Sequence, residues 1–439
     1  MPDEPQPPTQ PRTTSPIPSA VSTAVPASGG PADALPPAPL SRASLWRTRL
    51  LVAGLVLAAL NLRPAITSLG SLLEEVRVGL HMSGSVAGVL TSVPPLCFAV
   101  FGFAAPRLAR RFGPGAVVLA GMVAITAGLA LRPLAGGTAL FLVASACALM
   151  GIAVSNVLMP VIVKRYFPDR VGTMTGLYSM ALALGTAGAA AVTVPMTRAL
   201  GGWRPGLGIW AVLAAVAVLP WLGLIRERGT GPGSAAPSAA PTGLLLRRSR
   251  TAWALACFFG LQATGAYITM GWMPQIFRDA GVSAGTAGLL LALTMVMGVP
   301  LAFVIPRVAA RMRNQTPIVL ALGLCGLVAY AGLYFAPAQG AWLWALLLGI
   351  SNCAFPLALT MIGMRSRTGA GVVRLSAFAQ STGYLISIPG PLLVGVLYQH
   401  TGGWGLPIAL MAAFLVPQML AGAVAGRDRT IEDETRVRD

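Results

Sequence analysis

The chain has 439 residues, of which 55% are hydrophobic and only 10% are charged, and it contains 51 glycines and 36 prolines. Soluble domains typically carry about 25% charged residues, so this composition excludes an ordinary soluble protein and indicates a membrane protein with many spans. The formal charge of +18 does not indicate nucleic-acid binding, because the basic residues are spread over short segments and do not form one patch with interleaved aromatics.

Five segments are predicted along the chain. Residues 1–46 are rich in proline, serine and alanine, so they cannot bury a core and are predicted to form a disordered cytoplasmic tail that lacks the pattern of a signal peptide. Two six-helix bundles are predicted at 47–226 and 251–425. Residues 227–250 form a flexible cytoplasmic linker rich in glycine, alanine and proline, and residues 426–439 form a second cytoplasmic tail.

Apolar runs of about 20 residues predict twelve membrane-spanning helices. Their approximate limits are 48–70, 85–104, 115–134, 138–163, 172–194, 206–225, 252–275, 286–305, 317–336, 341–363, 374–397 and 405–425. With both termini inside, the tails and cytoplasmic loops hold 25 of the 31 Lys and Arg residues. The positive-inside rule therefore predicts cytoplasmic termini and a multi-pass protein of the plasma membrane. Five arginines are assigned to outer loops: Arg77, Arg132, Arg198, Arg204 and Arg278.

The two halves of the chain repeat several short patterns in the same order. The first half has AGVL at 87–90, PRLARR at 106–111, SNVLMP at 155–160 and GGW at 201–203; the second has AGLL at 287–290, PRVAAR at 306–311, SNCAFP at 351–356 and GGW at 402–404. Each pair falls on equivalent helices of a 6+6 arrangement. The fold is therefore predicted to be an all-α membrane protein of two parallel-repeat bundles, related by an axis along the membrane normal.

Three stretches carry a resemblance to a known family: NLRPAITSLGSLLEEVR, LTSVPPLCFAVFGFAAPRLARRFG and SNVLMPVIVKRYFPDRVGTMTGLYSMALALG. Over residues 50 to about 425 the chain resembles the major facilitator superfamily and, within it, the cyanate and nitroimidazole transporter family. In the loop after the second span, Pro106 and Arg110 stand where the superfamily signature has a glycine and an acidic residue. The resemblance implies secondary transport of a small anion or a compact polar heteroaromatic, and no enzymatic activity.

Arg63 stands beside Pro64 inside the first predicted span. An arginine at the centre of a membrane helix costs roughly 2.5–3.5 kcal/mol on insertion scales. None of the 13 acidic residues falls inside a predicted span, so Arg63 is predicted to be a lone buried cation. An anionic substrate would supply the missing negative charge and would accept hydrogen bonds from the planar fork of guanidinium donors. The alternative is a structural role, in which Arg63 snorkels outward or donates to carbonyls of neighbouring helices.

Pro64 lacks an N–H and cannot donate to the carbonyl one turn earlier, so it is predicted to break or kink the helix. Broken helices recur at transporter sites, and a packing kink alone is the alternative. On one continuous helix Arg63 and Thr67 share a face while Asn61 lies on another, so at most one of these faces points fully into the pore.

Polar side chains of other spans are predicted to complete the site. The predicted substrate-binding residues are Arg63, Asn61, Thr67, Asn156, Tyr178, Gln262, Tyr267, Asn352, Gln380 and Tyr384. Aromatic rings with a few amides suit a flat heteroaromatic or a small, weakly hydrated anion. For Asn156 and Asn352 interhelical hydrogen bonding is an equal alternative, and for the residues of spans 5, 7 and 11 helix packing is another.

Five basic residues lie at predicted cytoplasmic ends: Arg107, Arg110, Arg111, Arg307 and Arg311. They are predicted to set the topology, and a part in the gate is a second interpretation. Trp203, Trp253, Trp342 and Trp404 lie near helix ends and are interpreted as interface anchors.

The partners follow from the same observations. We expect a small-molecule substrate, a surrounding lipid bilayer, a monomer, no nucleic acid, and no cofactor or metal, because no histidine or carboxylate is predicted inside the spans. The second functional hypothesis is export of neutral drug-like compounds, with Arg63 structural. Substrate identity, direction and coupling stay open.

Overall fold

The computed structural model describes residues 42–225 and 246–435. The chain divides into two compact units, Met1–Leu45 and Trp46–Asp439, and the contacts reported below lie within the second. Residues 1–41 of the predicted N-terminal tail and most of the predicted linker fall outside the described residues. The last five residues of the predicted tail, 42–46, belong to the first helix instead.

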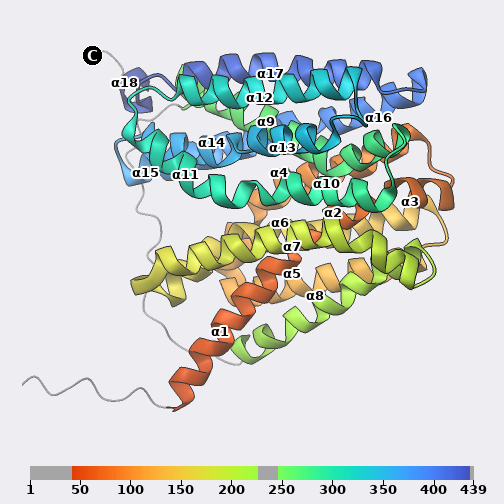
Figure 1. The fold of residues 1–439 in the computed structure, drawn as a ribbon. Coiled ribbons are helices and arrows are strands. Elements are labelled where there is room, and N and C mark those ends of the chain that lie inside the picture. Colours follow the sequence, from red (N-terminus) through yellow and green to blue (C-terminus); the bar gives the residue numbers. More distant parts are fainter. Residues whose placement is uncertain (1–41, 226–245, 436–439) are drawn as a thin grey trace, which may run out of the picture. The chain divides into compact units, whose positions relative to one another are not determined.

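Twelve of the described segments are helical, long and apolar enough to cross a membrane, which confirms the twelve predicted spans (Figure 1). The helices of the first half are α1 (Arg42–Asn61), α2 (Pro64–Ser71), α3 (Leu73–Gly79), α4 (Gly84–Phe112), α5 (Pro114–Leu131), α6 (Thr138–Tyr166), α7 (Val171–Ala199) and α8 (Trp203–Ile225). Those of the second half are α9 (Arg250–Asp279), α10 (Ala284–Val296), α11 (Gly298–Arg311), α12 (Thr316–Phe335), α13 (Ala341–Asn352), α14 (Ala354–Met364), α15 (Gly369–Ser387), α16 (Pro389–Thr401) and α17 (Gly405–Ala425), followed by the short α18 (Ile431–Thr435).

Four spans consist of two helices in succession: α1/α2, α10/α11, α13/α14 and α15/α16. Pro64 opens α2 and Pro389 opens α16. A proline suits the first turn of a helix, where the N–H is unused, but it cannot continue a helix that precedes it. The sequence therefore divides these two spans at defined points in the bilayer.

The sequence repeat has a counterpart in the turns. Ser83 caps α4 by accepting from the Val86 N–H, and Ser283 caps α10 by accepting from the Thr286 N–H. The turns before these caps also match, because residue 81 has φ of 53° and residue 281 has φ of 90°. Gly281 adopts this left-handed conformation without strain, whereas His81 must tolerate a Cβ there. The parallel repeat is thus a property of the fold.

The serine of each SN motif has the same neighbour in both halves. A Cβ added at Gly121 would lie 2.4 Å from the Ser155 Oγ, and one added at Gly326 would lie 2.5 Å from the Ser351 Oγ. Glycine is therefore required where the third span of each half crosses the fourth.

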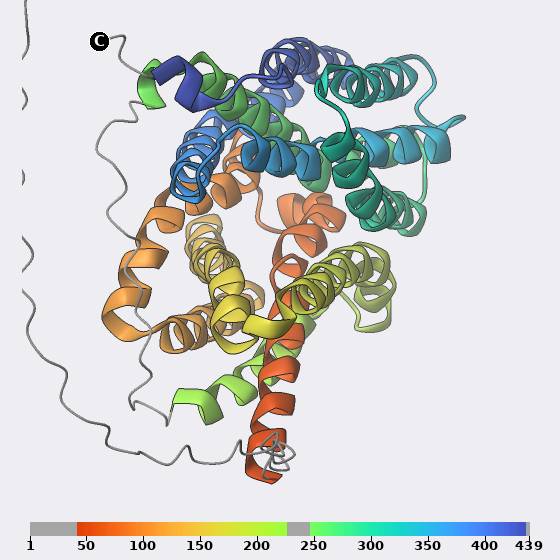
Figure 2. The ribbon, with the colours of Figure 1, turned by 90° about the vertical axis from the view of Figure 1, so that its left-hand side faces the viewer.

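The two halves are seen as two groups of helices in the view along the bundle (Figure 2). The main crossings that join them are α7 on α10, α4 on α16, α4 on α15 and α2 on α9. The backbones approach closely: a Cβ at Gly70 would lie 1.8 Å from the Met270 oxygen, and one at Gly288 would lie 2.6 Å from the Ala190 oxygen. We call the end of the bundle that carries α3 the α3 end, and the opposite end, which carries α18, the α18 end (Figure 1).

The segment after α17 is docked on the second half. The Ile431 N–H donates to the Arg365 carbonyl, and the Ile431 side chain is fully buried. Glu434 accepts hydrogen bonds from the Ser249 hydroxyl at 2.6 Å and from the Thr251 N–H at 3.0 Å. These groups form the first turn of α9, where a carboxylate is favoured by the helix dipole and by unpaired N–H groups.

Candidate substrate site

The break in the first span lies at Arg63. α1 ends at Asn61 and α2 begins at Pro64, and the intervening Arg63 has φ of −128° and ψ of −27°. The Arg63 carbonyl accepts from the Ile66 and Thr67 N–H groups at 2.9 and 3.1 Å, so it starts the second helix. The predicted interruption is confirmed, and it presents the Arg63 side chain from an irregular turn within the span.

The Leu60 carbonyl lacks its usual helical donor, because Pro64 has no N–H, and it faces another helix. A Cβ added at Gly185 of α7 would lie 2.2 Å from the Leu60 oxygen. Only glycine allows this approach, because any side chain would collide with backbone. Gly185 belongs to the GTAGAAA stretch, so this stretch allows α7 to pack directly against the break.

Three tyrosines surround the Arg63 side chain. Tyr267 of α9, Tyr178 of α7 and Tyr384 of α15 all lie within electrostatic reach of the Arg63 guanidinium. The structure therefore brings the three predicted tyrosines, from both halves of the chain, around a half-buried arginine.

Phenylalanines extend this group into an aromatic wall. The Phe98 ring stacks on Tyr384 with a centroid distance of 5.1 Å and an interplanar angle of 22°, and it lies 6.5 Å from Tyr267. Phe259 meets Tyr384 edge-on at 5.2 Å and lies 5.8 Å from Phe355. Phe98, Phe259 and Phe355 were not predicted as site residues, because a phenylalanine in an apolar span gives no sequence signal that separates a cavity wall from ordinary packing.

The predicted amides divide into paired and unpaired groups. Asn156 accepts a 2.5 Å hydrogen bond from the Tyr178 hydroxyl, and Gln380 donates to the Ser376 hydroxyl at 2.7 Å. Gln262 Oε1 and Asn352 Nδ2 are buried, and neither has a hydrogen-bond partner among the described residues. One free acceptor and one free donor are thus left on α9 and α13.

Asn61 and Thr67 are engaged with the backbone. The Asn61 amide donates to the Leu57 carbonyl at 2.7 Å and to the Leu213 carbonyl of α8 at 3.3 Å. The Thr67 hydroxyl donates to the Arg63 carbonyl at 3.3 Å and is fully buried. Asn61 therefore points toward α8, and the structure does not bring it to the tyrosines.

Carboxylates are scarce near this site. Within the described spans the one carboxylate is Asp279, the last residue of α9, although the sequence places it in a loop. The salt bridges found among the described residues do not involve Arg63. The guanidinium therefore lies among phenol groups and forms no ion pair with an acid among the described residues.

The expectation that Arg63 is a lone buried cation is wrong, because Arg132 and Arg365 are more deeply buried, at 0% and 2% exposure. Arg365 donates to the Ala425 and Gly426 carbonyls at 2.8 Å and to the Gln315 side chain. Burial of the guanidinium lowers the pKa of Arg365 below its ordinary value. The charge count places Arg365 and Arg132 in loops, although Arg132 falls near the end of the predicted span 115–134. In the structure each lies at a helix end, and its side chain folds back among the helices.

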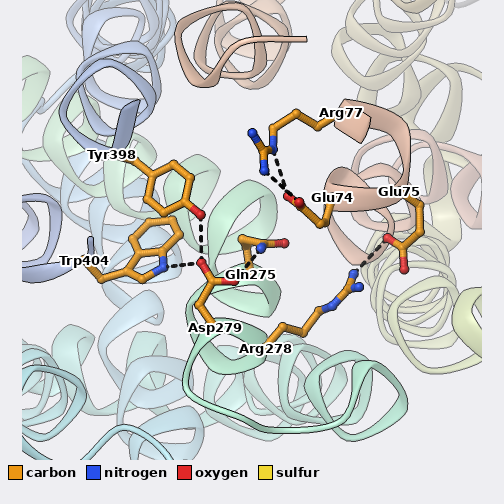
Figure 3. A network of polar contacts seen from close by, with 8 residues as sticks. All are labelled: Glu74, Glu75, Arg77, Gln275, Arg278, Asp279, Tyr398 and Trp404. Atoms are coloured by element: carbon orange, nitrogen blue, oxygen red, sulfur yellow. Dashed lines mark hydrogen bonds and ion pairs between the residues drawn. The ribbon is translucent and has the colours of Figure 1, made fainter. Parts of the chain in front are cut away.

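The α3 end is closed by a polar network (Figure 3). Arg278 of α9 donates to Glu75 of α3 at 2.8 Å, which joins the two halves. Within α3, Arg77 pairs with Glu74 at 2.7 Å. The hydrogen bond to Glu74 raises the pKa of Arg77 and outweighs the lowering by burial.

Asp279 is the acceptor at the centre of the other part of this network (Figure 3). It accepts from the Tyr398 hydroxyl at 2.9 Å, from the Trp404 indole at 2.8 Å and from the Gln275 amide at 2.7 Å. The Trp404 ring stacks on Tyr398 at 4.4 Å. The interpretation of Trp404 as an interface anchor is therefore incomplete, because its polar edge is committed to Asp279.

The predicted gating arginines lie at the opposite, α18 end, on the last turns of α4 and α11. Their side chains are exposed: Arg107, Arg110, Arg111, Arg307 and Arg311. Arg307 donates to the Phe303 carbonyl at 3.2 Å, and Arg111 lies over the Phe112 ring at 5.2 Å.

Comparisons with known proteins agree with this architecture. A Major Facilitator Superfamily model matches residues 50–368. The chain is 36% identical over 404 residues to an uncharacterized transporter, YycB, of Bacillus subtilis (strain 168), which covers 90% of this chain and 97% of that protein. It is 32% identical to the 2-nitroimidazole transporter of Escherichia coli (strain K12) over 383 residues, covering 87% and 96% of the two chains.

Two further likenesses support the assignment. The cyanate transport protein CynX of Escherichia coli (strain K12) is 31% identical over 367 residues, covering 83% of this chain and 94% of that protein. A bacterial homologue of the human lysosomal transporter Spinster has the same fold, with a TM-score of 0.70 at 16% identity over 87% of this chain and 96% of that chain. The chain therefore belongs to the Major Facilitator Superfamily, among the relatives of the cyanate and 2-nitroimidazole transporters, and is a multi-pass membrane transporter, not an enzyme.

Proposed function

We propose that the protein is a secondary carrier for a small anion or a compact polar heteroaromatic of the cyanate or nitroimidazole kind, with Arg63 as the anchor of the substrate. The observation that carries this proposal is the position of the Arg63 guanidinium among three tyrosines, with no ion pair to a carboxylate among the described residues. A guanidinium removed from water without a counter-charge is costly. An oxyanion or nitro group would supply two acceptors in the plane of its fork.

The aromatic wall favours a flat or linear substrate. Phe98 and Tyr384 present ring faces, and a delocalised anion with a thin hydration shell loses little when it moves against such faces. The free amide groups of Gln262 and Asn352 would accept from a ring N–H and donate to a substrate oxygen. The hydrogen bond between Tyr178 and Asn156 would keep the Tyr178 side chain in place beside the Arg63 guanidinium.

Alternating access would use the two ends of the bundle. The α3 end is held by the Glu75–Arg278 ion pair and by the crossing of α2 on α9, so this conformation would admit substrate from the α18 end. With the termini cytoplasmic, as the positive-inside rule predicts, that is the cytoplasmic side of the plasma membrane. The exposed arginines of α4 and α11 would then act at the cytoplasmic gate when the halves rock. The carrier would work as a monomer.

Uptake into proteoliposomes tests the proposal. The probes are cyanate, nitrate, benzoate and 2-nitroimidazole, and the variants are Arg63→Gln and Arg63→Lys. We expect uptake of the transported anion to fall at least about tenfold in both, because lysine lacks the planar fork. Arg198→Gln is the matched control, since Arg198 is an exposed arginine at the end of α7.

Two results would count against the proposal. Wild-type rates of anion uptake in either Arg63 variant, with normal insertion, would remove Arg63 from the substrate site. Loss of stability in Arg63→Gln together with unchanged transport of neutral compounds would instead favour the second hypothesis, export of neutral drug-like molecules with Arg63 structural.

A further inference from the structure

Arg132 is a fully buried cation that the site described above does not use. It follows the last residue of α5 and opens the short 3-10 turn Arg132–Leu134. The turn is held in place, because the Arg204 guanidinium donates to the Pro133 and Ala135 carbonyls at 2.7 and 2.9 Å. The Arg132 side chain is therefore presented into the bundle from a braced turn.

The guanidinium of Arg132 has more donors than its neighbours satisfy. Its Nε donates to the Ser145 hydroxyl at 2.9 Å and its Nη1 to the Ala65 carbonyl at 2.8 Å. The Phe141 ring lies 5.8 Å from the guanidinium carbon. All three neighbours are neutral. The Nη2 atom is buried and has no hydrogen-bond partner among the described residues, although guanidinium N–H groups require acceptors when they are removed from water.

Arg132 lines a small cavity between α2, α4, α6 and α9. Its volume of about 10 Å³ gives room for one water molecule at most in this conformation. Gly70 and Gly271 line the same cavity, and Gly70 makes the close contact of α2 with α9. The cavity therefore lies in the seam that must part when the α3 end opens.

Tyr267 connects this cavity to the Arg63 site. It lines the cavity together with Arg132, and it also lies within electrostatic reach of the Arg63 guanidinium. The rest of the wall is mostly apolar, with the Thr91 hydroxyl as a further polar group. A ligand in an enlarged cavity would thus meet a free guanidinium edge, a phenol and hydrocarbon.

We propose that Arg132 forms a second anion subsite, between the Arg63 site and the α3 end, which is completed when α2 and α9 separate. This inference rests on the proposed function, because its ligand is the same small, weakly hydrated anion. An anion that enters from the α3 end meets Arg132 first and then moves to Arg63, with Tyr267 in reach of both positions. Transport in the opposite direction uses the same steps in reverse.

A purely structural role explains less. A side chain that only links α2 to α6, by donating to the Ala65 carbonyl and the Ser145 hydroxyl, could be a neutral donor and would need no charge. A buried guanidinium beside neutral groups alone carries a large desolvation cost. The charge has a use if an anion occupies the cavity for part of the transport cycle.

The test compares an anionic and a neutral probe in proteoliposomes of the full chain. The probes are cyanate and 2-nitroimidazole, the latter at pH 5.5, where its ring keeps the N–H proton and is neutral. The variants are Arg132→Gln and Arg132→Lys. Arg198→Gln is the matched control, because it removes an exposed arginine at the end of α7 that does not line the cavity. The concentration of cyanate that stabilises the detergent-solubilised protein against heat is measured in parallel.

We expect Arg132→Gln to raise the KM for cyanate at least tenfold, Arg132→Lys to raise it less, and Arg198→Gln to change it less than twofold. Uptake of neutral 2-nitroimidazole stays within twofold of wild type in all three. Equal loss of both probes, or the same effect in Arg198→Gln as in Arg132→Gln, would overturn the subsite.

Failure of the proposed function has a different signature. If the wild type takes up no cyanate, the thermal measurement still shows whether Arg132 binds the anion. Stabilisation by cyanate that is present in the wild type and lost in Arg132→Gln supports the subsite. Equal stabilisation of both proteins, or no stabilisation of either, overturns it.

Discussion

Gly70→Ala is expected to open the α3 end. The added Cβ would lie 1.8 Å from the Met270 carbonyl oxygen, and real Cβ atoms essentially never approach closer than 3.0 Å. The obstacle is backbone, so it cannot turn away as a flexible side chain would. α2 and α9 must therefore move apart by more than an ångström, and this separation is the motion that opens the α3 end.

The size of the shift in population follows from how Gly70→Ala changes the free energies of the open and closed states of the α3 end. Alanine favours a helix over glycine by about 1 kcal/mol, but α2 is helical whether the α3 end is open or closed, so this gain cancels. The clash exists only in the closed state and costs about 1–3 kcal/mol, the usual range for overpacking. Since about 1.4 kcal/mol corresponds to a factor of ten, the population open at the α3 end should rise roughly 5- to 150-fold.

Cysteine labelling measures this population. Thr91 lines the seam cavity and is buried in the closed state, so Thr91→Cys in a variant without the five native cysteines reports opening. A membrane-impermeant maleimide is added to intact cells. Gly265→Ala is the matched control, because a Cβ there meets no atom within 4 Å. Equal labelling rates in Gly70→Ala and Gly265→Ala would refute the reasoning.

Three further predictions use matched pairs in the same way. Gly185→Ala should lower the free energy of unfolding by about 1–3 kcal/mol, seen as a lower melting temperature, while Gly188→Ala should not, because its Cβ meets no atom within 4 Å; equal melting would contradict this. Glu75→Gln breaks the ion pair between the halves and should raise labelling up to about fivefold, from a loss of about 0.2–1 kcal/mol, whereas Glu74→Gln breaks one within α3 and should not. Glu434→Gln should lower stability by about 0.5–2 kcal/mol at pH 7. Burial alone would raise the pKa of Glu434, but the hydrogen bonds from the first turn of α9 outweigh it and lower the pKa below its ordinary value of 4.5. The difference in melting temperature between wild type and Glu434→Gln should therefore shrink as the pH falls through and below 4.5. It should disappear once the carboxyl is protonated in the folded protein.

The twelve spans could be predicted because hydropathy depends on each segment alone. A run of apolar residues must be helical in the bilayer, since each backbone group needs a partner within its own segment. The break at Arg63 could be predicted for the same reason, because Pro64 removes one N–H wherever the helix lies. The repeat with 200-residue spacing predicted which helices are equivalent, and the matching turns at His81 and Gly281 bear this out.

The convergence of side chains was predictable only in part. Tyr178, Tyr267 and Tyr384 were chosen from helices that face the cavity in this architecture, and the structure brings them around Arg63. The direction of Asn61 was not fixed by helical periodicity, because the break turns the helix between Asn61 and Pro64. The residue that satisfies its amide, Leu213, is 152 positions away in sequence.

Arg132 shows why a count of charges in predicted spans can miss a buried cation. It follows an apolar run and precedes a proline, a pattern that indicates a helix end at the membrane surface. The end of a helix fixes where the backbone leaves the bilayer, but an arginine side chain reaches several ångströms from it. Here it reaches inward, because the Ala65 carbonyl beyond the break in the first span offers an acceptor. Ala65 is the second residue of α2, the helix that Pro64 opens, so the acceptor of Arg132 lies directly after the turn that carries Arg63. A substitution of Pro64 that restores a continuous helix should therefore disturb the surroundings of both cations.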